Sequence, residues 1–362
     1  MFIDAAQSRT SGARLARRLT VVAVWTAFAL AGAACAATNF LDPEGPRYYE
    51  TAPSANERTA PADSGGPLRV VTFNIEYGRE IDGAIRLIQA AEALRSPDIL
   101  LLQEMSSAGV IRIAAGLGLN YLYYPSGIHP QARQEYGTAI LSPWRLEEPQ
   151  KLLLPHGAAV TGMRRAVTVA TVLWREVRIR VFSVHLPAPM SIDETQRREQ
   201  VQRILESADR RPGPVIVAGD FNSRAVGPWF ERDGFAWTTK DLPGTSRGPG
   251  FWLSFDHLFV RGMGAAGGNA SAGYVEAPGI SDHRPVWVRL TSASLATAPQ
   301  AGSIRMGYDH PHHALPCQDP AGVPAANGPR DPPARPERRL APACAGSCGA
   351  RPAVPVEHAF RE

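Results

Sequence analysis

Short apolar runs alternate with segments of helical periodicity through the middle of the chain. Three runs have the length and the Val/Ile/Leu content of buried strands: residues 68–73, 98–102 and 215–218. Between the first two, apolar residues recur at helical spacing at Ile81, Ile85, Ile88 and Leu94. Pro97 ends that helical element just before the second strand begins. The pattern therefore predicts a β-α-β unit over residues 68–102.

A second unit of the same kind lies further along the chain. Residues 191–194 fit a capping box, and Val201, Ile204 and Leu205 form the buried stripe of a charged helix that leads to a strand at 214–218. Ahead of this unit, two apolar runs are separated by only two residues, which predicts an antiparallel hairpin at 167–174 and 177–186. Both sheets are therefore expected to be mixed. Two mixed sheets pack best face to face with their helices outside.

The ends of the chain differ in composition from this middle part. We expect four segments: a signal peptide or membrane anchor at 1–36, a disordered linker at 37–66, one α/β domain at 67–292, and a disordered Pro/Ala/Arg-rich tail at 293–362. None of the four cysteines lies inside the expected domain, so its fold should not depend on disulfides.

The N-terminal segment has the pattern of an export signal. Arg14, Arg17 and Arg18 precede an uncharged run at 19–41, whose first half is strongly apolar. The run is compatible with a cleaved signal ending near Ala36, with a lipoprotein signal at Cys35, or with an uncleaved anchor. We therefore expect export from a bacterial cytoplasm, to a periplasmic, secreted or membrane-anchored location.

The charge of the chain says little about its partners. The net charge is +4, and the arginines that produce it are spread along the chain without a basic block. Such a mild excess permits an anionic substrate, but it lacks the concentrated patch expected of a nucleic-acid-binding domain. No protein partner is predicted.

Polar clusters at the ends of the predicted strands carry the candidate chemistry. They lie in the segments 72–75, 101–104, 219–223 and 281–285, which contain Asn74, Glu104, Asp220, Asn222, Asp282 and His283. Polar residues at strand ends can meet at one edge of a sheet, where active sites are commonly built. Asp220 and Asn222 are two residues apart, so in an extended segment they would face the same side. Such a set is suited to phosphate-ester hydrolysis, because carboxylates bind Mg²⁺ and neighbouring polar groups orient water.

These clusters, in this order and spacing, resemble the endonuclease/exonuclease/phosphatase superfamily over about residues 68–290. The resemblance implies the deoxyribonuclease I-like four-layer α/β/β/α sandwich. It also implies a hydrolase that uses Mg²⁺, with Mn²⁺ as the other acceptable cation. The sequence Gly-Asp-Phe-Asn-Ser at 219–223 combined with Ser-Asp-His at 281–283 carries most of the specificity.

The resemblance also assigns roles to individual residues. It makes Glu104, Asn74 and Asp282 the metal-binding set. It makes His185, Asp220, Asn222, Asp256 and His283 the catalytic set. In this scheme Asp256 fixes the His283 tautomer, and either Asp220 or His283 takes the proton of the attacking water. His257 is expected to be structural, and Glu76 either contacts a metal-bound water or faces solvent.

The substrate is the least determined feature. A nuclease is the first prediction, and an enzyme acting on lipid or inositol phosphates is the alternative, so the partner is a phosphate ester in a nucleic acid or a phospholipid headgroup. A different class of function is a non-catalytic module that holds an anion in the cleft. The retention of all eight candidate residues argues against such a module, which would tolerate the loss of several.

Overall fold

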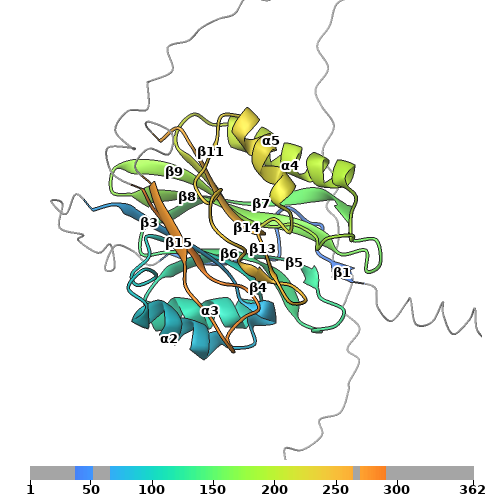
Figure 1. The fold of residues 1–362 in the computed structure, drawn as a ribbon, viewed down its shortest axis with the longest axis horizontal. Helices are drawn as coiled ribbons and strands as arrows, with labels where there is room; N and C mark the ends of the chain where they lie inside the picture. Colours follow the sequence, from blue (N-terminus) through green and yellow to red (C-terminus); the bar gives the residue numbers. More distant parts are fainter. Residues whose placement is uncertain (1–36, 52–65, 264–269, 291–362) are drawn as a thin grey trace, which may run out of the picture. The chain divides into compact units, whose positions relative to one another are not determined.

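The computed structural model describes residues 37–51, 66–263 and 270–290, and these form two packed β-sheets with helices outside (Figure 1). The helical elements are η1 (Glu76–Gly78), α2 (Ile81–Ala90), α3 (Ser107–Leu117), α4 (Glu194–Asp209), η2 (Arg224–Val226) and α5 (Gly227–Arg232). The expected signal or anchor at 1–36 and the expected tail from 293 lie outside the described residues, as does the linker segment 52–65.

The larger sheet has eight strands in the order β1-β5-β6-β4-β3-β16-β15, with β2 also paired to β5. Its strands are β1 (Thr38–Asn39), β2 (Tyr48–Glu50), β3 (Leu68–Asn74), β4 (Ile99–Met105), β5 (Asn120–Ile128), β6 (Glu135–Ser142), β15 (Ala270–Tyr274) and β16 (Val286–Leu290). Strands β3 and β4 are parallel and the other pairs are antiparallel, so this sheet is mixed as predicted.

The smaller sheet has six strands in the order β11-β14-β10-β9-β8-β7. Its strands are β7 (Leu146–Gly157), β8 (Arg164–Trp174), β9 (Val177–His185), β10 (Val215–Asp220), β11 (Ala236–Trp237) and β14 (Asp256–Arg261). The predicted hairpin is confirmed, because β8 and β9 are antiparallel, and β9-α4-β10 is the second parallel unit. A separate two-stranded hairpin is formed by β12 (Ser246–Arg247) and β13 (Trp252–Leu253).

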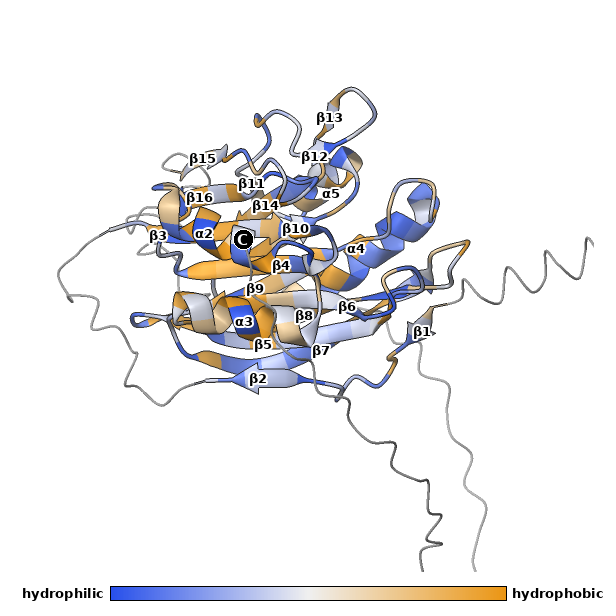
Figure 2. Ribbon diagram, turned by 90° about the horizontal axis from the view of Figure 1, so that it is seen from below, coloured by the Kyte–Doolittle hydropathy of each residue, from blue (hydrophilic) through white to orange (hydrophobic). Residues whose placement is uncertain are grey.

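Side chains that alternate along each strand form three apolar layers. In β3, Leu68 and Val70 pack between the two sheets, while Val71 and Phe73 pack beneath α2 and α3. In β10 the same alternation sends Ile216 between the sheets and its neighbours toward α4 and α5. Figure 2 shows the apolar residues concentrated on the inner strands. The four-layer α/β/β/α sandwich is therefore the fold of the chain.

Two local predictions were wrong. Residues 37–51 are part of the fold, because β1 and β2 pair with the edge strand β5 and the Lys151 ammonium donates to the carbonyls of Phe40 and Gly45. The capping box of α4 is formed by Asp193 and Gln196, since the Asp193 carboxylate accepts from the Gln196 amide at 2.8 Å. Within the described ranges, no helix has the length and hydropathy to cross a bilayer.

Candidate active site

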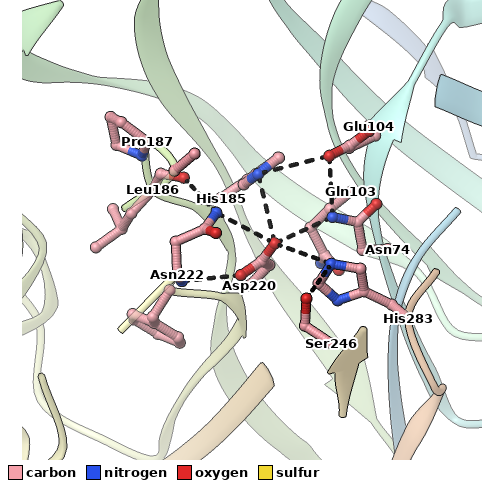
Figure 3. Close-up of polar contacts among 12 residues, drawn as sticks. Asn74, Gln103, Glu104, His185, Leu186, Pro187, Asp220, Asn222, Ser246 and His283 are labelled. Atoms are coloured by element: carbon pink, nitrogen blue, oxygen red, sulfur yellow. Dashed lines mark hydrogen bonds and ion pairs between the residues drawn. The ribbon is translucent and has the colours of Figure 1, made fainter. Parts of the chain in front are cut away.

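Strand alternation brings four of the candidate side chains into the space between the sheets. Asn74, His185, Asp220 and Asp256 stand at strand ends, in phase with the inner-facing residues of β3, β9, β10 and β14. Figure 3 shows the side chains of Asn74, His185 and Asp220 directed toward one another. His257 is one residue out of phase and accepts a hydrogen bond from the Trp237 indole on the helix side. It is therefore structural, as expected.

The Asp220 carboxylate contacts side chains from both sheets. Its Oδ2 accepts from the Asn74 amide of the other sheet at 3.1 Å. The same oxygen lies 3.5 Å from His185 Nε2 and 3.6 Å from His283 Nε2. The residue is buried, and burial raises the pKa of its carboxyl, an effect that the neighbouring His283 charge partly offsets.

Asp256 and His283 form a buried pair. His283 Nδ1 lies 2.9 Å from Asp256 Oδ2, and its Nε2 lies 3.1 Å from the Ser246 hydroxyl. The Thr245 hydroxyl donates to the same carboxylate oxygen at 2.7 Å. Burial lowers the pKa of His283, but attraction to Asp256 and Asp220 outweighs burial and raises it to about 10. The imidazole is therefore held in one orientation and in its charged form.

Glu104 reaches the site through an irregularity in β4. The pairing of β4 with β6 shifts register between Leu102 and Met105, and Glu104 has a φ of +60°. A bulge of this kind inserts one residue and re-aims its side chain. The Glu104 carboxylate thereby leaves the helix side of the sheet and accepts from the Asn74 amide at 3.2 Å and from the Tyr77 backbone N–H at 3.0 Å.

His185 completes the contacts between the two sheets. Its Nε2 lies 3.9 Å from the Glu104 carboxylate as well as near Asp220, and its ring packs on Tyr136. Burial lowers the pKa of His185 well below its usual range, and the Arg165 charge adds to this shift. Its Nδ1 has no hydrogen-bond partner among the described residues. A neutral imidazole in this position can donate a hydrogen bond to a phosphoryl oxygen.

Three candidate residues occupy positions that differ from the simplest expectation. Asn222 is not in an extended segment, because its φ is +51°, but its amide still donates to Asp220 Oδ2 at 3.3 Å and to the Leu186 carbonyl at 3.0 Å. Asp282 is exposed, and its charge raises the pKa of both Tyr77 and His283. Glu76 forms a partly exposed ion pair with Arg79.

The structure adds residues that the strand-end motifs did not reveal. Arg165 lies over the Tyr136 ring at 4.7 Å, and its buried Nε and Nη1 atoms have no hydrogen-bond partner among the described residues. Thr245 and Ser246 hold the Asp256–His283 pair from the start of β12, a strand of two residues that is too short to show a periodic pattern. The sequence offered one signal for Arg165: it is a charged residue directly before the apolar run at 166–173.

A second polar layer supports the site from within the sandwich. Gln103 accepts from the Thr72 hydroxyl at 3.3 Å and donates to the Ser183 hydroxyl at 3.3 Å, and all three side chains are buried. Ser183 also donates to the Leu102 carbonyl. Because buried polar groups are costly without partners, this network fixes β3, β4 and β9 in register behind the site.

The donor set fits a hard divalent cation. Glu104 and Asp220 are carboxylates bridged by one amide nitrogen, and Asp282 adds a third carboxylate whose charge acts on the neighbouring Tyr77 and His283. Carboxylate oxygens and water are the ligands that Mg²⁺ prefers. The ligand atoms of Asp220, Asp256 and His283 also lie within 4.8 Å of one another. Since both His283 nitrogens already have partners, we attribute that group to hydrogen bonding.

Residues 71–283, more than half of the chain, match the model of the Endonuclease/Exonuclease/phosphatase family. The chain belongs to this family. Its members are hydrolases that often depend on a divalent metal ion. No relative was found among curated proteins.

Several solved structures have a similar fold. A family protein from Leptotrichia buccalis is 15% identical, with 62% of this chain and 99% of that chain covered and a TM-score of 0.48. Humanized D. rerio TDP2 with 14 mutations is 17% identical, with coverage of 62% and 98% and a TM-score of 0.49. A family protein from Bacteroides thetaiotaomicron is 16% identical, with coverage of 62% and 94% and a TM-score of 0.49.

Proposed function

We propose that this chain is an exported, Mg²⁺-dependent hydrolase that cleaves a phosphate ester by in-line attack of water. The observation that carries the proposal is the convergence of Glu104, Asp220 and the Asp256–His283 pair from both sheets at one open end of the sandwich. Family membership supports the same chemistry. The export component rests on the N-terminal sequence alone.

The cation would be held by Glu104 and Asp282, with Asn74 fixing the Glu104 carboxylate. When bound, Mg²⁺ supplies positive charge to the phosphoryl oxygens and so lowers the repulsion felt by the incoming water. The negative charge of the site's carboxylates exceeds the positive charge of His283 beside them; these carboxylates belong to Glu104, Asp220, Asp256 and Asp282. That excess favours cation binding even before substrate arrives.

Asp220 is suited to accept the proton of the attacking water. Burial raises the pKa of its carboxyl, and a carboxylate with a raised pKa is a better base near neutral pH. His283 is charged at neutral pH because its pKa is raised, so it stabilises the negative charge that develops on the phosphoryl group. The alternative assigns the proton to His283 and the orientation of water to Asp220.

Binding of the phosphate involves donors that have no other partner. The free Nδ1 of His185 and the unpartnered Nε and Nη1 of Arg165 lie in the described part of the site without a protein acceptor. An anionic substrate would satisfy Arg165, because a guanidinium binds phosphate oxygens through paired N–H donors. This surplus of donors favours binding of an anion over a purely structural role for the cluster.

A substrate panel tests the proposal. The purified chain is offered plasmid DNA, RNA, phosphoinositides, sphingomyelin and a soluble chromogenic phosphodiester, each with Mg²⁺ and with chelator. We expect hydrolysis of the chromogenic ester and of one natural class, lost on chelation and restored by Mg²⁺ or Mn²⁺. Nucleic acid is the first class predicted and lipid or inositol phosphates are the second. Tight anion binding without hydrolysis of any substrate would instead favour the non-catalytic module.

A further inference from the structure

The most exposed large apolar side chains of the described residues lie on loops at the open end of the sandwich. Met190, Val160 and Phe251 have exposed fractions of 97%, 86% and 57%, the three highest values among large apolar residues of the described ranges. Trp252, beside Phe251, is 38% exposed. Single exposed apolar residues are ordinary, but the clustering of these four on the edge that holds the active site needs a reason.

Strand directions place these loops on the same edge as the site. Val160 follows β7 and precedes β8, and Met190 follows β9, whose last residue is His185. The two loops are joined by a hydrogen bond from the Ala159 amide to the Ser191 carbonyl at 2.8 Å. Strands lie about 4.8 Å apart, so β7 is on the order of 15 Å from the Asp220 strand. We call the two loops that carry Val160 and Met190, at 158–163 and 186–193, the flank loops.

The β12–β13 hairpin reaches the other side of the same site. The Ser246 hydroxyl of β12 forms a hydrogen bond with His283. Trp252 is the first residue of β13, and Phe251 directly precedes it. The Arg284 guanidinium stacks on the Trp252 ring at 3.7 Å, which couples the hairpin to the segment that carries His283. In Figure 2 the hairpin projects outward from the body of the domain. Apolar tips therefore stand on two sides of the site.

The N-terminal segment joins the domain at the flank loops. The Ala37 amide donates to the Thr161 carbonyl at 2.9 Å, and Thr38 pairs with Ile128 at the end of β5 nearest the site. Residues 19–36, which precede this point, are uncharged and largely apolar. An apolar segment attached at this edge would keep the edge close to the surface into which the segment inserts. Because an uncharged apolar segment of about this length can enter a bilayer, its attachment here favours a lipid bilayer as the surface that the edge meets.

We propose that the edge formed by the flank loops and the β12–β13 hairpin rests on a lipid bilayer, and that the scissile phosphate belongs to a phospholipid headgroup. This rests on the proposed function and narrows its substrate class. Apolar side chains of this number enter the headgroup boundary only shallowly, so they orient the domain and leave the N-terminal segment to retain it. The site then opens toward the headgroups.

Depth-dependent quenching tests the orientation independently of catalysis. In the full chain, the four cysteines are replaced by serine and a single fluorophore is attached at Met190→Cys, Phe251→Cys or Glu176→Cys. Glu176 is exposed in the β8–β9 turn, at the opposite end of the sandwich, and is the control. With vesicles of phosphatidylcholine and phosphatidylglycerol, spin-labelled lipid should quench the labels at 190 and 251 at least threefold more than the label at 176. Equal quenching at all three positions would overturn the proposal.

Substitution of the apolar tips tests the substrate class. The variant V160S/M190S/F251S should lose at least tenfold of its hydrolysis of phospholipid in vesicles and keep its turnover of the soluble chromogenic ester. Ile111→Ser, an exposed apolar residue of α3, is the matched control and should change neither rate. Equal loss on both substrates, or hydrolysis of nucleic acid but not of phospholipid, would contradict the proposal. Failure of the soluble assay in the unsubstituted chain would instead count against the proposed function.

Discussion

At the scale of single residues, the central feature is a carboxylate oxygen shared by both sheets. Asp220 Oδ2 is surrounded by the Asn74 amide, the Asn222 amide and two histidine nitrogens, all within 3.6 Å. The site is therefore assembled only when the two sheets pack in register. A residue in this position can serve catalysis and still reduce the stability of the fold, because a buried carboxyl is costly.

Substitution Asp220→Asn separates these two effects. The amide keeps the shape but cannot accept a proton, so we expect turnover to fall by about 10²–10⁴-fold. The melting temperature should stay level or rise, because the raised pKa of this carboxyl means that its ionised form destabilises the folded chain. Turnover and thermal melting of the same preparations check this. Asp209→Asn, at a surface pair with Arg261, is the control and should change neither measurement much.

The Asp256–His283 pair predicts a pH dependence of stability. The pKa of His283 rises from 6.5 to about 10 on folding, so the folded chain holds this proton more tightly than the unfolded chain. The stabilisation is complete below pH 6.5 and is lost as the pH rises toward 10. With chelator present, His283→Gln should therefore lower the free energy of unfolding by about 3 kcal/mol at pH 6 and by much less at pH 10. A gap that widens with pH would contradict the assignment.

At the scale of elements, the position of the site depends on close contact between β9 and β10. Gly219 has a φ of +147°, and a Cβ there would lie 1.9 Å from the Val184 carbonyl oxygen. Only glycine fits a backbone that approaches its neighbour this closely. The glycine of the Gly-Asp-Phe-Asn-Ser motif is thus explained by packing, and it sets the distance between Asp220 and His185.

Substitution Gly219→Ala should force these strands apart. We expect a loss of about 3 kcal/mol or more in the free energy of unfolding, together with loss of turnover. Gly118→Ala is the matched control, because Gly118 also has a positive φ but a Cβ added there would meet no atom within 4 Å. That variant should lose only about 1–2 kcal/mol, the cost of a left-handed backbone conformation in a residue with a Cβ. Urea unfolding of both variants distinguishes contact from backbone strain.

The N-terminal strands form a second element with a defined attachment. Burial lowers the pKa of the Lys151 ammonium to about 8, and this group satisfies the carbonyls of Phe40 and Gly45. In Lys151→Met those acceptors lose their donor, at about 1–3 kcal/mol. Amide hydrogen exchange over residues 37–50 should accelerate roughly tenfold or more while β10 is unaffected. Lys240→Met, which removes an exposed ion pair with Glu231, should leave residues 37–50 unchanged.

These elements explain what sequence could and could not reveal. Strand phase and strand-end motifs located Asn74, His185, Asp220 and Asp256 because period-two alternation is a direct consequence of the extended backbone. The bulge at Glu104 could not be read in advance, since its cause is pairing with β6. Strands β1 and β2 contain two and three residues, too few to show a period, and their stability comes from the edge of β5.

At the scale of the whole molecule, the four layers turn scattered motifs into one site. Residues 74, 104 and 282 come from one half of the sandwich and its connections, and residues 185, 220 and 256 come from the other. The alternation that fills the apolar layer between the sheets also lines the open end with polar groups. Thr245 and Ser246 were missed because they lie at the start of a two-residue strand and reach the site through tertiary packing, which no local pattern encodes.

The most direct test of the account is turnover of a soluble chromogenic phosphodiester by the unsubstituted chain and by Glu104→Gln during titration with Mg²⁺. We expect turnover that requires Mg²⁺ and falls by at least about 10³-fold in Glu104→Gln, at an unchanged melting temperature in chelator. Asp193→Asn, at the exposed cap of α4, is the control. Mg²⁺-dependent turnover retained in Glu104→Gln would contradict the assignment of this carboxylate to the cation and with it the proposed site.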